Sequence, residues 1–125
     1  MGNLTKNLSR HEMACKCGCG ADSMDIETIN VVQDVCDEFE CTVTVTSAHR
    51  CFEYNRSPAV GSNDKSQHPQ ARAMDCVFKV GGIEIDPEEV DDYLKDKYEG
   101  KYGFGLYASF NHIDTRSGPP ARWGD

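Results

Sequence analysis

Three side chains in this sequence have types and spacing that could bind a divalent metal ion. They are His68, Asp75 and His112. His68 and Asp75 are seven residues apart. On a strand through His112, the side chain of Asp114 would point to the same face as that of His112. Two imidazole nitrogens and one carboxylate oxygen, with a vacant fourth position, are a usual coordination of catalytic zinc. A histidine and an aspartate at this spacing are more often surface residues or partners in ordinary hydrogen bonds than metal ligands. The neighbouring sequence is therefore needed to decide between these interpretations.

The elements that would position these residues can be read from local patterns. Asp25–Glu40 is predicted to be a helix, because its apolar residues recur at steps of three and four. Cys41–Thr46 alternates valine and threonine, which is typical of a strand. Pro69 disfavours a helix through His68, so a loop followed by a strand over Ala71–Lys79 is predicted. A turn at the end of that loop would fold His68 back beside Asp75.

The remaining segments complete the predicted fold. Ser47–Gln67 contains proline, glycine and several small polar residues and is predicted to be mostly loop. Pro87–Lys97 is predicted to be a second helix, and Gly103–Leu106 and Phe110–Thr115 to be short strands. Because helices and strands follow one another without βαβ regularity, we expect an α+β fold with a small antiparallel sheet and flanking helices. A single domain over residues 1–125 is expected.

Composition excludes some classes of function. The formal net charge of −8 argues against a nucleic-acid partner, because contact with phosphates needs a basic face. No apolar run reaches the roughly 20 residues of a membrane span. Residues 1–10 lack the apolar core of a secretory signal, so synthesis in a cytoplasm without an export signal is expected. A monomer is expected.

Seven cysteines form the second group of reactive side chains. An odd number cannot pair completely into disulfides, and free thiols are the usual state in a reducing cytosol. Cys15, Cys17 and Cys19 could instead form a second metal site or a redox cluster, although structural zinc sites usually have two or more residues between ligands. The sequence leaves the state of these three thiols open.

The sequence around the candidate ligands resembles that of one known family. Ser66-x-His68-x-x-x-x-Ala73-x-Asp75 resembles the Ser-x-His-x-x-Gly-x-Ala-x-Asp signature of the zinc D-alanyl-D-alanine carboxypeptidases, which share their zinc-site architecture with hedgehog domains. Residues 46–55 look like the family's Ser-Gly-Tyr-Arg-Ser-x-x-Tyr-Asn segment, and Phe110–Arg116 like its closing strand. Gly118–Trp123 resembles the tail of the small murein endopeptidase branch. The likeness therefore runs in order along most of the chain.

The resemblance implies a role for particular residues. It makes His68, Asp75 and His112 the ligands of a Zn²⁺ cofactor. Arg50 would bind a substrate carboxylate or the developing oxyanion, for which a guanidinium with two parallel donors is well suited. Ser66 and Gln67 would line the site and hydrogen-bond the substrate.

Two departures from the family pattern concern the chemistry. Ala71 stands where the signature has glycine, and Ser109 stands where the larger carboxypeptidases have a carboxylate that acts as general base. Asp114 is the first candidate to replace that base, or else it orients a zinc ligand, and His49 is the second candidate. The identity of the general base remains open at this point.

The functional expectation is a zinc peptidase that hydrolyses peptidoglycan stem peptides, as a carboxypeptidase or a murein endopeptidase. A phage endolysin, acting at the cell wall during lysis or as part of the virion, is the expected setting. The alternative is a non-catalytic zinc-containing binding or virion structural module. The sequence does not specify the scissile bond, its stereochemistry or the host.

Overall fold

A six-stranded sheet forms the centre of the molecule in the computed structural model, which describes residues 3–62 and 66–124. The strand order is β1-β2-β5-β4-β6, and β3 pairs with the free end of β2. The strands are β1 Thr42–Ser47, β2 Ala73–Val80, β3 Ile83–Glu84, β4 Gly103–Leu106, β5 Asn111–Asp114 and β6 Ala121–Trp123. The helices are α1 Ile26–Phe39, α2 Phe52–Arg56 and α3 Pro87–Lys97, preceded by one 3₁₀ turn, η1 Arg10–Met13.

The predicted α+β class is confirmed, with one correction to the sheet. Every pairing among β1, β2, β3, β5 and β4 is antiparallel, but β6 runs parallel to β4, so the sheet is mixed. The reason is that β2 already occupies one edge of β5 and β4 the other. After the turn near Gly118 the returning chain therefore pairs with the free edge of β4, which runs in the same direction.

The long loop predicted over Ser47–Gln67 holds one helix that the sequence pattern did not predict. This is α2, whose five residues are too few to show a helical period. The Cys51 sulfur caps it by accepting a hydrogen bond from the Tyr54 N–H group. Residues 63–65 of the predicted loop lie outside the described residues.

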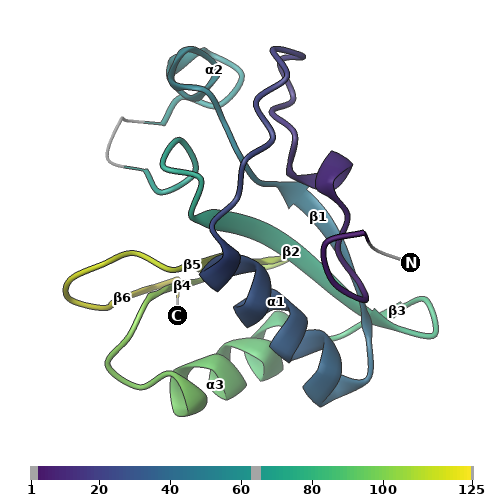
Figure 1. Ribbon diagram of the computed structural model, residues 1–125. Coiled ribbons are helices and arrows are strands. Elements are labelled where there is room, and N and C mark those ends of the chain that lie inside the picture. Colours follow the sequence, from purple (N-terminus) through teal and green to yellow (C-terminus); the bar gives the residue numbers. More distant parts are fainter. Residues whose placement is uncertain (1–2, 63–65, 125) are drawn as a thin grey trace.

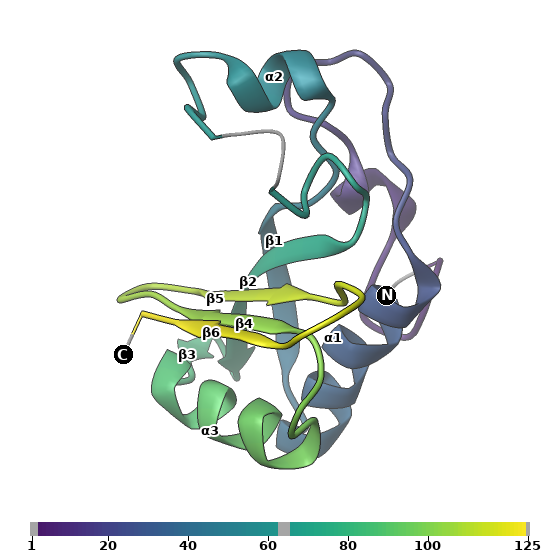
Figure 2. The same ribbon diagram turned by 90° about the vertical axis from the view of Figure 1, so that its left-hand side faces the viewer.

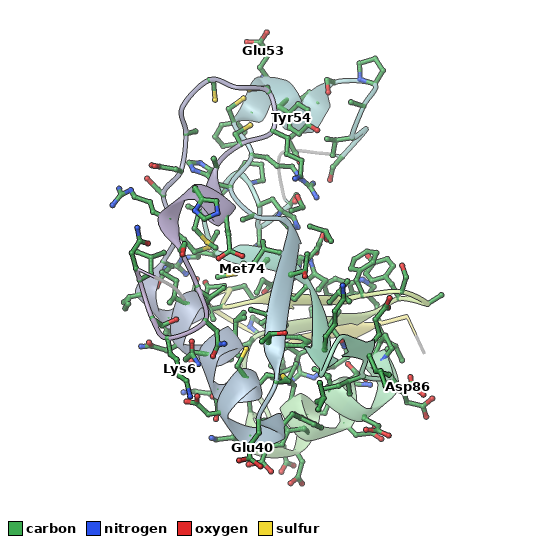
Figure 3. All side chains as sticks on the ribbon, turned by 90° about the vertical axis from the view of Figure 1, so that its right-hand side faces the viewer. Lys6, Glu40, Glu53, Tyr54, Met74 and Asp86 are labelled. Atoms are coloured by element: carbon green, nitrogen blue, oxygen red, sulfur yellow. The ribbon has the colours of Figure 1, made fainter. Side chains whose placement is uncertain are left out.

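The hydrophobic core lies on one face of the sheet, where α1 and α3 cover it (Figure 1). Alternation along the strands sends Met74, Cys76 and Phe78 of β2 into this core, together with Ile113 of β5 and Phe104 of β4. Figure 3 shows Met74 inside this packed interior. The same alternation turns the residues between them, Asp75 and His112 included, to the opposite face.

The segments 14–22, 49–62 and 66–72 lie beyond that opposite face and will be called the upper lobe (Figures 1 and 2). It carries α2 and the turn that contains His68. Among its described residues only Cys15, Asn55, His68 and Pro69 are buried, and none belongs to the hydrophobic core. No described helix is long and apolar enough to span a membrane.

Candidate metal centre

Two of the candidate ligands face each other across neighbouring strands. Asp75 of β2 and His112 of β5 are directly paired in the antiparallel register. His112 Nδ1 lies 3.0 Å from Asp75 Oδ1, and both side chains are buried. Since opposed side chains on adjacent strands have closely spaced Cβ atoms, the register alone brings this imidazole and this carboxylate together.

The third candidate ligand comes from a turn. His68 lies in the turn at residues 66–71, and its Nε2 atom is 3.3 Å from Asp75 Oδ1. The turn is closed by hydrogen bonds from the Ala71 N–H to the His68 carbonyl and from the Arg72 N–H to the Gln67 carbonyl. Ala71 has a φ of 58°, a left-handed conformation that explains why glycine suits this position in the signature. Ligand atoms of His68, Asp75 and His112 all lie within 4.8 Å of one another.

The second nitrogen of each imidazole is fixed by a hydrogen bond. His68 Nδ1 donates to the Ala48 carbonyl at 2.7 Å, which leaves the Nε2 lone pair facing Asp75. His112 Nε2 donates to Asp114 Oδ2 at 2.7 Å, and Arg116 holds the two oxygens of Asp114 with Nε and Nη2 at 2.8 and 2.7 Å. Such contacts hold the rings of metal-binding histidines in one orientation.

The two carboxylates beside the histidines are held in their charged form. Burial alone would raise the pKa of the Asp75 carboxyl, but hydrogen bonds to His112 and His68 outweigh it and hold that pKa well below its usual range. The pKa of Asp114 is also well below its usual range, because Arg116 and His112 oppose the effect of burial. Burial alone would lower the pKa of His112, but contacts with Asp114 and Asp75 outweigh it, so that this pKa lies above its usual value. Both carboxylates are therefore charged at neutral pH.

Two glycines on β4 make room for the side chains of the site. Gly103 pairs with Asp114, and Gly105 pairs with His112. A Cβ atom on Gly103 would overlap both carboxylate oxygens of Asp114, and one on Gly105 would overlap the Trp123 ring. This close approach requires glycine at both positions. The sequence Gly-Phe-Gly thus places Phe104 in the core and leaves the opposite face of β4 without side chains.

The three candidate ligands line a cavity of about 310 Å³. Its lining includes two guanidinium groups and an aromatic wall, in a set that comprises Arg50, Ser62, Ser66, Gln67, His68, Asp75, Tyr107, His112, Arg116 and Trp123. Among the described lining residues Asp75 is the only carboxylate. Two imidazole nitrogens and one carboxylate oxygen facing an open cavity form a donor set that suits a catalytic zinc ion.

The sequence pattern that defines Peptidase M15 matches residues 6–114, which is most of the chain. This protein belongs to peptidase family M15. Members of this family are zinc-dependent metallopeptidases that act on peptidoglycan-type substrates, so Zn²⁺ is the cofactor of this chain. Comparison with curated proteins and with solved structures gave no match.

The structure places most of the predicted site residues of this M15 peptidase at one cavity. Arg50, Ser66 and Gln67 line it together with His68, Asp75 and His112. Arg50 is held by Ser47 Oγ and Asn55 Oδ1, both at 3.1 Å, and its Nη2 lies 3.6 Å from Asp75 Oδ2.

The two candidates for the general base do not line the cavity. Asp114 is fully buried behind His112 and is engaged by Arg116, so it is not placed to touch a molecule in the cavity. His49 turns the other way, and its Nδ1 accepts a hydrogen bond from the Ser23 N–H at 3.1 Å. Burial lowers the pKa of His49, with partial opposition from Asp22. Ser109 lies in the exposed turn between β4 and β5.

Arg116 is the main residue of the cavity that sequence reasoning missed. It both anchors Asp114 and lines the cavity, where its guanidinium lies 5.5 Å from the centre of the Trp123 ring. Trp123 in turn donates from Nε1 to the Tyr107 hydroxyl at 3.0 Å. A signal was available in the sequence, since Arg116 alternates with His112 and Asp114 along the chain. The contribution of Trp123 depends on the parallel pairing of β6, which was not predicted.

Proposed function

We propose that this M15 peptidase hydrolyses peptide bonds in the stem peptides of bacterial peptidoglycan, with His68, Asp75 and His112 as its zinc ligands. The observation that carries the proposal is the meeting of these three side chains at the floor of a cavity, beside the guanidinium of Arg50. A zinc ion held there would polarise the scissile carbonyl and lower the pKa of a bound water molecule to about 7.

The protein's own groups provide orientation and charge. Ala48 and Asp114 hold the two imidazole rings, so that His68 presents Nε2 and His112 presents Nδ1. Ser66 and Gln67 offer hydrogen-bond partners for a peptide in the cavity. Tyr107 and Trp123 form a wall against which an extended peptide can lie.

Arg50 is the proposed partner of a substrate carboxylate. Stem peptides carry free carboxylates at their C-terminus and on side chains, and a fixed guanidinium binds such a group with two donors. Ser47 and Asn55 hold Nε and Nη1 of Arg50, which directs Nη2 toward the metal centre. A carboxylate bound by Arg50 would therefore lie next to the bond to be cut.

Replacing Arg50 tests this assignment. We expect Arg50→Ala to raise KM for peptides with a free carboxylate by about 10-fold or more, because a charge-assisted hydrogen bond contributes roughly 1.5–3 kcal/mol. Zinc content should be unchanged. Arg10→Ala is the matched control, since Arg10 is exposed, pairs with Asp22 and does not line the cavity. An unchanged KM in Arg50→Ala contradicts the carboxylate clamp.

Asp114 is proposed to act through His112 as a positioning residue. Its carboxylate touches Nε2 of His112 and the guanidinium of Arg116, and it is shielded from the cavity. Of the two roles predicted for Asp114, general base and orienting residue, these contacts support the second. His49 is less well placed as a base, because it does not line the cavity.

The deciding experiment is digestion of purified sacculi by the zinc-loaded protein, followed by mass spectrometry of the released muropeptides. Loss of a terminal alanine would identify a carboxypeptidase, and separated cross-links or shortened stems would identify an endopeptidase. His68→Ala should lose the activity, whereas His11→Ala, at an exposed position, should keep it. If wild type and His68→Ala release the same products, the proposal is wrong.

A second candidate function is a zinc-containing binding module without catalysis. The observation in its favour is that Ser109 occupies the position of the usual carboxylate, and Asp75 is the sole carboxylate among the described lining residues. Such a module would bind sacculi without releasing peptides. Pelleting with sacculi, combined with the digestion above, separates the two candidates.

Bacteriophage lysis or penetration of the cell wall is the biological setting we propose for this enzyme, which would act at the wall as a monomer. The peptidoglycan-type substrates of the family support it. A neighbouring holin or tail-protein gene would strengthen the proposal, and a neighbourhood of housekeeping bacterial genes would contradict it.

A further inference from the structure

Four cysteines of the upper lobe meet at one point outside the catalytic cavity. Cys15, Cys17 and Cys19 come from the loop before α1, and Cys51 comes from the start of α2. Their sulfur atoms all lie within 4.8 Å of one another. Figure 3 shows sulfur atoms gathered beside α2, near the labelled Tyr54. None of the four cysteines is disulfide-bonded.

The distances among three of these sulfur atoms are close to those of a tetrahedral metal site, and the fourth sulfur lies within 4.8 Å of each of them. The Cys15–Cys17, Cys17–Cys51 and Cys15–Cys51 separations are 3.4, 3.6 and 3.9 Å. A zinc ion bound to four thiolates at about 2.3 Å requires sulfur atoms about 3.8 Å apart at the corners of a tetrahedron. The observed spacing therefore needs little adjustment to accept such an ion.

The backbone explains how cysteines at alternate positions reach one point. In a straight strand, alternate residues are about 7 Å apart, which is too far for one zinc ion. Here the chain curls, because Gly18 and Gly20 have φ values of 83° and 89° and the Gly18 N–H donates to the Cys15 carbonyl. The turn draws Cys15, Cys17 and Cys19 around a common centre. One intervening residue is then sufficient where two are usual.

Backbone donors already point at two of the sulfurs. The Cys51 N–H donates to the Cys15 sulfur at 3.4 Å, and the Tyr54 N–H donates to the Cys51 sulfur at 3.3 Å. Such hydrogen bonds stabilise thiolates around a metal and hold them in orientation. They come from the backbone of the lobe itself, independently of the contacts between the four sulfurs.

The described residues of the upper lobe are held by hydrogen bonds and not by a hydrophobic core of their own. No described residue of 14–22 or 49–72 belongs to the hydrophobic core. Small units without enough apolar surface to bury are usually stabilised by disulfides or by a metal ion. The lobe nevertheless supplies Arg50 and His68 to the catalytic cavity, so its position has to be fixed.

We infer that Cys15, Cys17, Cys19 and Cys51 bind a second zinc ion, which has a structural role. Four thiolates close its coordination shell, whereas the catalytic site has three ligands and an open position. The ion ties the loop before α1 to the start of α2. Because Cys51 directly follows Arg50, it also fixes the backbone that presents that guanidinium to the substrate.

Metal analysis of the full chain, purified under reducing conditions, tests the inference. We expect two zinc ions per chain in the wild type, and one in Cys17→Ser, in Cys19→Ser and in His68→Ala. Cys41→Ala is the control, because it removes a buried core thiol away from the cluster and should keep both ions. Cys17→Ser should also lower the melting temperature by several degrees, while retaining the ion at the histidine site.

Cobalt substitution adds a readout that does not depend on the folding of a cysteine variant. A tetrahedral thiolate site gives a sulfur-to-cobalt charge-transfer band in the near ultraviolet, which a site of nitrogen and oxygen ligands does not give. We expect this band in wild type and in His68→Ala. A single zinc ion that is lost entirely in His68→Ala, or the absence of the thiolate band from the cobalt-substituted wild type, would overturn the inference. Neither result would affect the proposed peptidase activity.

Discussion

The sheet and the upper lobe contribute to the same cavity but are stabilised in different ways. The sheet presents Asp75 and His112 from paired strands that rest on a core of fully buried side chains. The upper lobe presents His68 and Arg50 from segments that hydrogen bonds hold in place, beside the four clustered sulfurs. Half of the site is therefore fixed by hydrophobic burial and strand register, and the other half by polar contacts.

The two halves of the site therefore differ in how easily their side chains can change position. Two groups on neighbouring strands cannot shift relative to each other without breaking the ladder of backbone hydrogen bonds. A turn such as residues 66–71 can change its shape at a smaller cost, since it has few buried neighbours. We expect damage on the sheet side to affect the metal centre most directly.

The largest effect is expected from His112→Ala. This change removes the ligand between Asp75 and Asp114, so that each buried carboxylate loses its contact with the imidazole. We expect loss of the catalytic zinc ion and of detectable hydrolysis, measured by metal analysis and muropeptide release. The exposed His11→Ala is the control. A variant that retains full zinc at the histidine site would exclude His112 from the ligand set.

Asp114→Asn should have an intermediate effect. It keeps the shape of the side chain but weakens the hold on His112 and removes the charge that pairs with Arg116. We expect zinc affinity, measured by competition with a chelator, to fall by about 10- to 100-fold. Turnover at saturating zinc should be largely retained. Unchanged zinc affinity with lost turnover would instead make Asp114 a proton-transfer group.

Gly103→Ala tests whether the flat face of β4 is required. The added methyl group would overlap the Asp114 carboxylate and the Arg116 guanidinium, so one of them must move. We expect a loss of about 1–3 kcal/mol in the free energy of unfolding, together with weaker zinc binding. Ser109→Ala, in the exposed turn after β4, is the control and should change neither quantity. Equal stability of the two variants would contradict the close approach.

The smallest effect, and the one of opposite sign, is expected on the lobe side. Ala71 has a left-handed backbone conformation, and glycine would relieve its strain. Ala71→Gly should stabilise the protein by up to about 1 kcal/mol in chemical unfolding, even though glycine adds freedom to the unfolded chain. Ala59→Gly is the control, at an exposed position without positive φ, and should be slightly destabilising. If both variants are destabilised equally, Ala71 is not strained.

The parts that the sequence predicted are those with a clear period or a recognisable motif. The helix over 25–40 and the strand over 71–79 agree with α1 and β2 to within two residues, because apolar residues recur with helical or strand spacing. The family signature also predicted His68 and Asp75 as ligands, and the likeness of the closing strand predicted His112.

The features that were not predicted depend on contacts between segments far apart in the chain. Nothing in the local sequence of β6 specifies that it pairs with β4 and brings Trp123 to the cavity. The shielding of Asp114 depends on Arg116 and on the absence of a side chain at Gly103. Cys51 lies far beyond Cys19 in the chain, so its place beside the other three cysteines depends on the folded loops. Local spacing carries none of this information.

The pairing of Asp75 with His112 has a practical consequence for protein engineering. These two side chains form one rung of the β-ladder and keep a constant span, whereas His68 reaches them from a turn. Anyone wishing to retune the centre for a larger cation, or to graft it onto another scaffold, can keep that rung as an invariant half. Redesign can then be confined to the length and composition of residues 66–71.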